Sequence, residues 1–229
     1  MTYAITGRCK PVIRLLEQHG ARCLTIAPNT VLPEPVREHA DMLVYDDGGE
    51  LLTYDASLAD TLRLYGVACT CPSIPLERDY PGCVRLNCLR VGGYLLANTK
   101  ACAPEVLDSA HNQGLEIVHV RQGYARCSTA VLDDRAVITA DSGIADSLSI
   151  RGVEVLRITP GHISLPGYDY GFIGGCCVRL GDAMIVCGDI HRHPDGGQMI
   201  EFIESRGLRV ECAGDGELFD FGGAVVITR

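Results

Sequence analysis

The sequence predicts a single α/β domain in which five copies of one ββαβ unit close into a ring, like the five blades of a propeller with pseudo-fivefold symmetry. Three observations predict this fold class. Residues 127–158 contain one complete unit, a helix-ending glycine recurs along the whole chain, and the two chain ends each hold part of one further unit. Repetition of one supersecondary unit at a roughly fixed period is the sequence signature of a repeat array.

The complete unit reads as strand, turn, strand, helix, strand. Residues 127–132 and 135–140 are short apolar and β-branched runs, and the acidic pair between them is typical of a hairpin turn. Asp141 can accept hydrogen bonds from the first free N–H groups of the helix that follows, and Gly152 is typical of a residue at which a helix ends. Residues 153–158 then form the third strand.

A glycine at the end of each predicted helix marks the same unit along the chain. These glycines are Gly20, Gly66, Gly114, Gly152 and Gly207. Successive members are 38 to 55 residues apart, and the 229 residues divide into five units of about 46 residues. Units of this size cannot each bury a core, so we expect one domain.

One of the five units is split between the chain ends. Its first strand is residues 224–228, and its remainder is the strand 3–6, the helix 11–19 and the strand 22–26. The single domain 1–229 then divides into units of residues 224–229 with 1–40, 41–86, 87–126, 127–175 and 176–223. Joining the two ends within one unit closes the ring and leaves no open sheet edge.

The remaining elements follow the same order along the chain. Pro11 lies in the first turn of the first helix, where its missing N–H costs nothing. His39-Ala40-Asp41 leads directly into a strand, and long connectors at residues 72–82 and 159–175 separate some of the units. Further predicted strands are residues 42–45, 50–54, 67–71, 94–97 and 115–120, and further predicted helices are residues 56–65 and 104–112.

Composition and charge narrow the class of protein. The net charge of −9 argues against a nucleic-acid partner, which needs a basic face, and it suits a cationic small-molecule substrate. No apolar run approaches the roughly 20 residues that span a bilayer, and the start MTYAITGRCK lacks the pattern of a signal peptide. We therefore expect a cytoplasmic protein with no membrane partner, while the oligomeric state stays open.

The twelve cysteines agree with this location. They form no CxxC pattern and mostly stand alone at strand positions. Reduced, buried thiols act as small apolar residues and are usual in a reducing compartment, so we expect no disulfide framework. No GxGxxG or P-loop pattern predicts a nucleotide cofactor.

The starts of the units differ from one another, whereas other equivalent positions are alike. After the second strand, the five units carry Thr6, Asp55, Asn98, Asp141 and Asp189, all of which can cap a helix. At the start of the first strand, one unit carries His39-Ala40-Asp41, another carries Ala125-Arg126-Cys127, and two carry Gly174-Gly175 and Gly222-Gly223. Because packing alone asks for similar residues in equivalent places, these differences indicate function.

These unit starts resemble those of the penteins, a superfamily of five-bladed α/β propellers that includes arginine deiminases, dimethylarginine hydrolases and amidinotransferases. The family pattern is an acidic Gly-Gly segment, a His-x-Asp one unit later, and a nucleophilic cysteine two units after that. Here Asp220-Phe221-Gly222-Gly223, His39-Ala40-Asp41 and Ala125-Arg126-Cys127 follow in the same cyclic order. The linear order differs, so the resemblance implies a circular permutation.

Two positions depart from the family pattern. Phe221 takes the place of the acidic residue directly before Gly-Gly, which leaves Asp220 one step away. The C-terminal strand 224–228 has no cysteine, although the enzymes usually place theirs near the C-terminus. An enzymatic interpretation therefore depends on Cys127.

The resemblance implies a cysteine-dependent hydrolase or amidinotransferase that acts on a guanidino-type small molecule. Cys127 would attack the guanidinium carbon to form a covalent thiouronium, and His39 would protonate the departing amine and then activate water. Asp41 would complete the catalytic group by holding the flat cation. The resemblance implies that Asp220 binds substrate. We also expect Asp169 and His162 to contact substrate, because the long connector that carries them can form a lid over one mouth of the propeller. The alternative is a non-catalytic binding protein of the same fold, like the ribosome anti-association factor of eukaryotes and archaea.

A second polar cluster, residues 189–195 with the sequence DIHRHPD, precedes the last predicted helix. A His-x-His pair with flanking carboxylates is typical of zinc sites. Asp195 can instead be the N-cap of the helix, and we favour this interpretation. The sequence therefore predicts neither a metal nor an organic cofactor.

Overall fold

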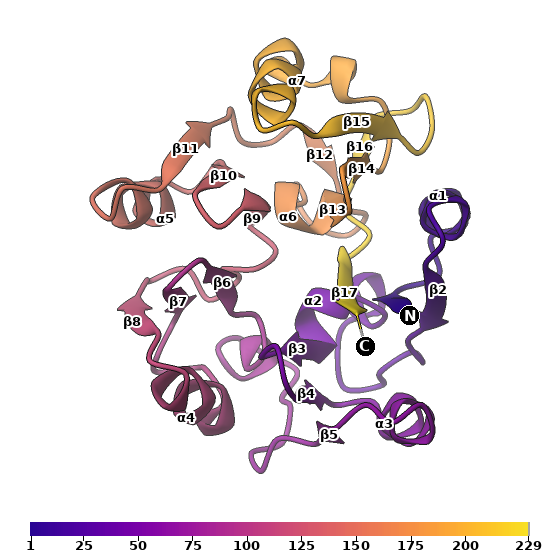
Figure 1. Cartoon of the computed structure of the whole chain (residues 1–229), viewed down its shortest axis with the longest axis vertical. Coiled ribbons are helices and arrows are strands. Elements are labelled where there is room, and N and C mark those ends of the chain that lie inside the picture. The colour runs from indigo at the N-terminus through magenta and orange to yellow at the C-terminus, as the bar shows by residue number, and fades with distance from the viewer. Residues whose placement is uncertain (229) are drawn as a thin grey trace.

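The computed structural model describes residues 1–228 and contains five three-stranded sheets within that range (Figure 1). In each of these sheets the first and second strands are antiparallel and the second and third are parallel. This is the pairing that a ββαβ pattern predicts, because parallel neighbours need a crossover between them. Arg229, which the predicted domain and its split unit include, lies outside the described residues.

The strand order along each sheet repeats from one sheet to the next. The five sheets are β17 (Ala224–Thr228), β1 (Thr2–Thr6) and β2 (Arg22–Thr25); β3 (Val44–Asp46), β4 (Leu51–Thr53) and β5 (Cys69–Thr70); β6 (Leu89–Val91), β7 (Tyr94–Ala97) and β8 (Glu116–His119); β9 (Thr129–Asp133), β10 (Ala136–Thr139) and β11 (Glu154–Arg157); β13 (Cys177–Leu180), β14 (Ala183–Val186) and β15 (Arg209–Cys212). A short parallel pair, β12 (Ile163–Ser164) and β16 (Leu218–Phe219), is separate. Figure 1 shows the five sheets placed around a common centre, and first strands contact one another there, for example β17 with β13 and β3.

One longer helix joins the second and third strands of each three-stranded sheet and lies at the outer rim in Figure 1. These helices are α1 (Lys10–Gln18), α3 (Ala56–Leu64), α4 (Pro104–Asn112), α5 (Ser142–Ser149) and α7 (Gly196–Ser205). The glycine predicted to follow each of them has a positive φ, between 68° and 81°, as a left-handed helix end requires. Within residues 1–228, no helix is both long and apolar enough to cross a membrane.

The predicted helix caps are confirmed at some positions and not at others. The carboxylate of Asp55 accepts hydrogen bonds from two N–H groups of α3, and that of Asp141 accepts one from α5. Asp189 caps a short 3₁₀ turn, η3 (Ile190–Arg192), rather than α7. Asp195 is the N-cap residue of α7 as predicted, but its carboxylate makes no capping hydrogen bond and instead accepts one from the backbone N–H of Thr159.

The split sheet is formed by both chain ends as predicted. Strand β17 pairs antiparallel with β1, and the register joins Thr2 with Thr228 and Thr6 with Ala224. The hydroxyl oxygens of Thr2 and Thr228 are 3.4 Å apart. The two described chain ends therefore lie side by side, and β1 has a strand on each of its edges.

The structure corrects the prediction that His39-Ala40-Asp41 leads directly into a strand. Residues Ala40–Leu43 form a helical turn, α2, before β3 begins. Residues Ile173–Cys176 form an equivalent turn, α6, before β13, and Cys127 also lies in a turn before its strand β9. The chain therefore passes from a loop through a turn before it enters the first strand at each of these points.

The 3₁₀ turns η1 (Glu34–Val36) and η2 (Gly82–Val84) lie in the connectors before α2 and β6. The buried core fills the space between sheets and helices and spans the seams between neighbouring units. For example, Val12 and Leu16 of α1 belong to the same apolar cluster as Ile185 of β14. Burial of side chains across these seams stabilises the contacts between neighbouring units.

Candidate active site

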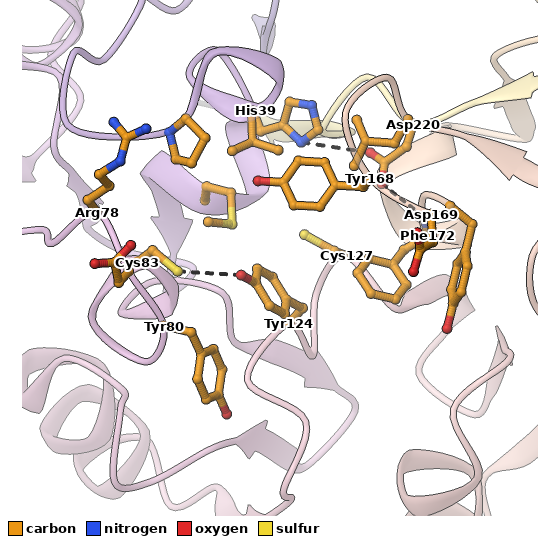
Figure 2. Close-up of a pocket in the computed structure, with 16 residues that line it drawn as sticks. His39, Arg78, Tyr80, Cys83, Tyr124, Cys127, Tyr168, Asp169, Phe172 and Asp220 are labelled. Carbon is orange, nitrogen blue, oxygen red and sulfur yellow. Dashed lines mark hydrogen bonds and ion pairs between the residues drawn. The ribbon is translucent and has the colours of Figure 1, made fainter.

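The starts of two units and the segment before the split unit meet at one cavity of about 430 Å³ (Figure 2). His39 comes from the turn before β3, and Cys127 from the turn before β9. Asp220 comes from the segment between β16 and β17. A thiol, an imidazole and a carboxyl from distant parts of the chain therefore share one cavity.

Asp41 and Asp220 form an acidic pair around the imidazole of His39. The Nδ1 atom of His39 is 3.9 Å from Oδ1 of Asp41 and 3.8 Å from Oδ1 of Asp220. The Asp220 carboxylate is held by hydrogen bonds from the N–H groups of Phe172 and Gly222, at 2.8 and 3.0 Å. Asp41 is 2% exposed, and within the described part of the chain neither of its carboxylate oxygens has a hydrogen-bond partner.

Asn87 positions the thiol of Cys127. Its Nδ2 donates to Sγ of Cys127 at 2.8 Å, and its Oδ1 accepts from the N–H groups of Arg126 and Cys127 at 2.9 and 3.1 Å. Asn87 is 1% exposed. This single side chain therefore fixes both the backbone of the turn and the direction of the sulfur.

The Gly-Gly pairs allow the backbone to approach these groups closely. A Cβ atom on Gly175 would overlap the carboxylate of Asp220, and a Cβ atom on Gly222 would overlap His39. Gly222 also has a φ of 82°, which L side chains rarely adopt. Gly175 and Gly222 therefore leave room for the side chains of Asp220 and His39, which come from neighbouring unit starts.

Burial raises the pKa values of both carboxyls. Removal from water raises the pKa of Asp41 to about 8, and the charge of Asp220 acts in the same direction. Burial also raises the pKa of Asp220, although His39 opposes this shift. Both carboxyls are buried and offer oxygen atoms within 4.8 Å of each other, which favours retention of a proton by the pair at neutral pH in the ligand-free protein.

The Cys127 thiol and the His39 imidazole are both uncharged in the ligand-free protein. Burial lowers the pKa of His39, against the charge of Asp220. Burial raises the pKa of Cys127 well above its usual range, the charges of Asp41 and Asp220 add to this, and the hydrogen bond from Asn87 opposes it. A cation placed among these groups would lower the pKa of the thiol and of both carboxyls.

Aromatic rings form much of the wall of the Cys127 cavity. The ring of Tyr124 lies 6.0 Å from that of Tyr80 and 6.0 Å from that of Phe172, measured between centroids. Tyr170 meets Phe172 edge-on at 6.1 Å, and Tyr168 also lines the cavity. Aromatic faces attract cations, so the wall and the carboxyls favour the same kind of ligand.

The structure brings most of the predicted site residues together. Cys127, His39, Asp41 and Asp220 converge, and Asp220 faces the cavity although Phe221 takes the family's acidic position. Phe221 instead packs into the core. Asp169 lines the cavity and also a neighbouring cavity of about 370 Å³.

His162 is not placed among these residues. It lines the neighbouring cavity, where its ring meets that of His193 edge-on at 5.5 Å. Sequence analysis also missed Asn87, although this residue begins its unit at a position like those of His39 and Cys127. That equivalence was the available signal, but an amide is common in turns and carries no reactive group of its own.

Among residues 1–228, the one group of three close metal-binding side chains is His39, Asp41 and Asp220, whose ligand atoms lie within 4.8 Å of one another. The histidines of the DIHRHPD cluster do not join such a group. His191 pairs with Asp189 at 2.9 Å, whereas Nδ1 of the buried His193 accepts from the backbone of Asp195. The Cys127 cavity is therefore lined by a thiol, an imidazole and the carboxyl of Asp220, and the carboxyl of Asp41 is buried beside His39.

Comparisons with solved structures find this fold in enzymes. DDAH from Pseudomonas aeruginosa, complexed with citrulline, superposes with a TM-score of 0.61 at 11% identity, over 97% of this chain and 95% of that one. Inosamine-phosphate amidinotransferase from Streptomyces griseus gives 0.60 at 13%, over 95% and 78%. The amidinotransferase SxtG from Microseira wollei gives 0.58 at 12%, over 92% and 87%. The predicted resemblance in fold to these enzymes is thus confirmed, as a mixed α/β fold.

Comparisons with known sequences identify a family but no function. The model of a family of unknown function (DUF6873) matches residues 4–225. No curated protein sequence matches the chain.

Proposed function

The chain belongs to the DUF6873 family, whose function is unknown, and we propose that it is a cysteine-dependent hydrolase or amidinotransferase for a guanidino-type small molecule. The structural neighbours support the general class, because they include a dimethylarginine dimethylaminohydrolase and amidinotransferases. Fold alone does not assign an activity, so the proposal rests on the chemistry of the cavity.

The observation that carries the proposal is the buried carboxyl of Asp41 beside Cys127 and His39. A buried carboxyl without a hydrogen-bond partner is costly and needs an explanation. A guanidinium ion supplies both a positive charge and N–H donors in a plane, which suit two facing carboxylates. Asp41 and Asp220 thus provide the acceptors that such a cation requires.

The proposed reaction begins with a proton transfer from the Cys127 thiol to the neutral imidazole of His39. The thiolate attacks the guanidinium carbon, and the C–N bond to the leaving amine breaks as His39 returns the proton to that amine. The intermediate is a thiouronium on Cys127. His39 then takes a proton from water, the oxygen adds to the carbon, and the C–S bond breaks. The Cys127 thiolate takes the proton back from His39, and the urea-type product loses its extra proton to solvent as it leaves. An amine in place of water completes an amidino transfer.

The cationic substrate activates its own nucleophile in this proposal. Without ligand, the pKa of Cys127 is raised by burial and by Asp41 and Asp220, so the thiol is protected from side reactions. A bound guanidinium neutralises the carboxylates and favours the thiolate. Asn87 contributes a positioned N–H donor to the same sulfur.

The finer description of the fold belongs to the same proposal. We propose that the five sheets act as the blades of one propeller domain with a pseudo-fivefold axis, circularly permuted relative to the enzymes. The repeated sheet order and the pairing of β17 with β1 support this description. The unpaired thiols are compatible with a cytoplasmic location.

The test is a mass-spectrometric screen of the intact protein against guanidino compounds and haloacetamidines. We expect a covalent adduct that maps to Cys127, absent in Cys127→Ser and unchanged in Cys71→Ser, which removes an exposed thiol instead. Urea-type or amine products without an adduct at Cys127 would contradict the mechanism.

A binding protein without catalysis is the second candidate, and the high pKa of the ligand-free Cys127 favours it. The two candidates differ in one result of the same screen. Saturable binding of guanidino compounds that never modifies Cys127 and leaves the ligand intact would support the binding protein. Turnover would exclude it.

A further inference from the structure

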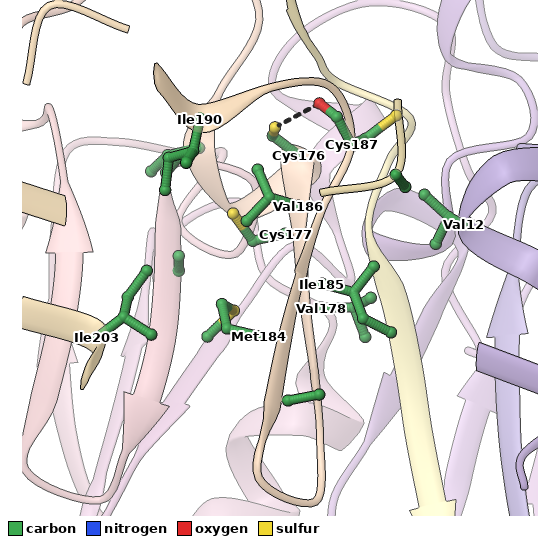
Figure 3. Close-up of a cluster of buried hydrophobic side chains, with 14 of the residues drawn as sticks. Val12, Cys176, Cys177, Val178, Met184, Ile185, Val186, Cys187, Ile190 and Ile203 are labelled. Carbon is green, nitrogen blue, oxygen red and sulfur yellow. Dashed lines mark hydrogen bonds between the residues drawn. The ribbon is translucent and has the colours of Figure 1, made fainter. Parts of the chain in front are cut away.

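A pair of close thiols lies outside the Cys127 cavity, at the seam between the split unit and the unit of residues 176–223. The sulfur atoms of Cys9 and Cys187 are 3.6 Å apart, although the residues are 178 positions apart in the chain. Cys9 directly precedes α1, and Cys187 directly follows β14. In Figure 3, the side chain of Cys187 lies at the edge of the buried cluster, with its sulfur directed away from Cys176.

Cys9 is placed to be the reactive member of this pair. It is the N-cap residue of α1, where the helix dipole stabilises an anion. The hydrogen bond with Cys187 lowers the pKa of Cys9 to about 7 against the effect of burial, and the nearby amide of Val12 acts in the same direction. Cys9 is partly exposed and lines a cavity of about 350 Å³, which gives a small oxidant access to its sulfur.

Cys187 has the complementary properties of a resolving thiol. It is 6% exposed, and its pKa is raised by its hydrogen bond to Cys9 and by burial. It therefore stays protonated and protected until its neighbour is oxidised.

A second pair of close thiols, Cys88 and Cys102, provides a comparison within the same protein. The sulfur atoms of Cys88 and Cys102 are closer, at 3.1 Å, but both residues are buried. The hydrogen bond with Cys102 and burial raise the pKa of Cys88 well above its usual range. Proximity alone thus predicts oxidation of this pair first, whereas thiolate character and access predict oxidation of Cys9 and Cys187 first.

We propose that Cys9 and Cys187 are a peroxide-sensitive dithiol that closes into a disulfide across the seam between the split unit and the unit of residues 176–223. The Cys9 thiolate attacks one oxygen of hydrogen peroxide, the O–O bond breaks, and a sulfenic acid and hydroxide form. The Cys187 sulfur then displaces the sulfenic hydroxyl, which leaves as water after taking up the thiol proton. Two thiols and one peroxide become one disulfide and two waters.

The disulfide would tie the N-terminal helix to the strand that the structure packs against it, since α1 contacts β14. A cross-link that closes a loop of this length restricts the unfolded chain strongly. We expect the oxidised protein to melt about 5 °C or more above the reduced protein.

The experiment treats the full-length protein with up to a few equivalents of hydrogen peroxide, blocks the remaining thiols and maps the peptides by mass spectrometry. We expect a Cys9–Cys187 cross-linked peptide that dithiothreitol reverses, formed before any Cys88–Cys102 cross-link. In Cys187→Ser, dimedone should trap a sulfenic acid on Cys9, and Cys9→Ser should abolish oxidation of Cys187.

Earlier formation of a Cys88–Cys102 cross-link in the wild-type protein would overturn the proposal, because it would show that proximity dominates. Alkylation of Cys9 at neutral pH no faster than that of the exposed Cys71 and Cys212, with no Cys9–Cys187 cross-link, would also overturn it. Both outcomes are read on the wild-type protein, so they do not depend on how the variants fold. Neither depends on turnover at Cys127.

Discussion

At the scale of single residues, the site combines groups that are each unfavourable in the ligand-free protein. Among residues 1–228, neither carboxylate oxygen of the buried Asp41 has a hydrogen-bond partner, and Cys127 is a buried thiol near two carboxyls. Functional sites are where such costs are usually found, because the ligand removes them. Removing the charge of Asp41 should therefore stabilise the fold but weaken ligand binding, so the two effects are opposed.

The first prediction concerns that opposition. The folded-state pKa of Asp41, about 8, exceeds the ordinary 3.8, so protonation favours the folded state and stability is lost as pH rises through this window. Asp41→Asn keeps the shape without the proton equilibrium. We expect it to stabilise the protein by about 2–4 kcal/mol at pH 7, more at pH 9 and little at pH 4, in urea denaturation. An effect independent of pH would contradict the shifted pKa.

The second prediction concerns Asn87. Removing its N–H donor in Asn87→Ala should raise the pKa of Cys127 and slow alkylation of that thiol at neutral pH by roughly 10-fold or more, because hydrogen bonds to charged groups contribute about 1.5–3 kcal/mol. The measurement is the pH profile of Cys127 alkylation, and Asn112→Ala on the outer helix α4 is the control. A uniform slowing without a shift of the profile would indicate a merely structural role for Asn87.

The reactive side chains of the site could be predicted from the sequence better than the contacts that orient them. Cys127 and His39 stood out because equivalent unit starts lack those groups. The direction of Asp220 could not be predicted, because it depends on the hydrogen bond from Phe172 in a connector far away in the sequence. His162 was placed in the site because its connector is long, but the contact with His193 holds its ring in the neighbouring cavity.

At the scale of elements, short turns rather than strands present the site. The N–H of Asp41 donates to the carbonyl of Gly222, so the turn α2 is tied to the Gly-Gly segment of the split unit. The sequence predicted the helix-ending glycines, which are local signals, and missed α2, whose conformation depends on this long-range contact. A local sequence pattern predicts an element well only where the hydrogen bonds that stabilise the element are also local.

The third prediction tests the Gly-Gly segment. Gly222→Ala places a methyl group on His39 at a positive φ, so we expect loss of ligand binding and a drop of about 5 °C or more in melting temperature. Gly197→Ala in α7 is the matched control, because its Cβ meets nothing within 4 Å. This control should be neutral or slightly stabilising, since alanine favours helices. Equal behaviour of the two variants would mean that the close approach is unimportant.

At the scale of the whole molecule, the chain ends are part of the fold. Strand β17 lies between the rest of its sheet and the first strands of two other sheets, so it covers the edge of β1. The sequence predicted the pairing of β17 with β1 from the repeat period, because each of the two segments carries only part of one unit. The arrangement around the cavity could not be predicted in detail, because the connectors that line it do not repeat.

The fourth prediction follows from the pairing of β17 with β1. Removing residues 224–229 should unfold the protein or leave it aggregated, because two sheet edges lose their partner. A permuted chain whose natural ends are linked and which opens between Gly214 and Asp215 keeps β17 and serves as the control. We expect the permuted chain to melt within a few degrees of the wild type. A truncated chain that melts like the permuted one would contradict the role of β17.

The central claim is that Cys127 is the nucleophile of a cation-binding site, and site-resolved labelling with a limiting amount of a haloacetamidine tests it most directly. This cationic reagent should alkylate Cys127 first among the twelve thiols at neutral pH, and His39→Ala should slow that reaction while labelling of the exposed Cys71 stays unchanged. A neutral haloacetamide should lose this preference, since it cannot offset the charges of Asp41 and Asp220. Earlier labelling of Cys83, Cys176 or Cys177, or uniformly slow labelling of all thiols, would contradict the account.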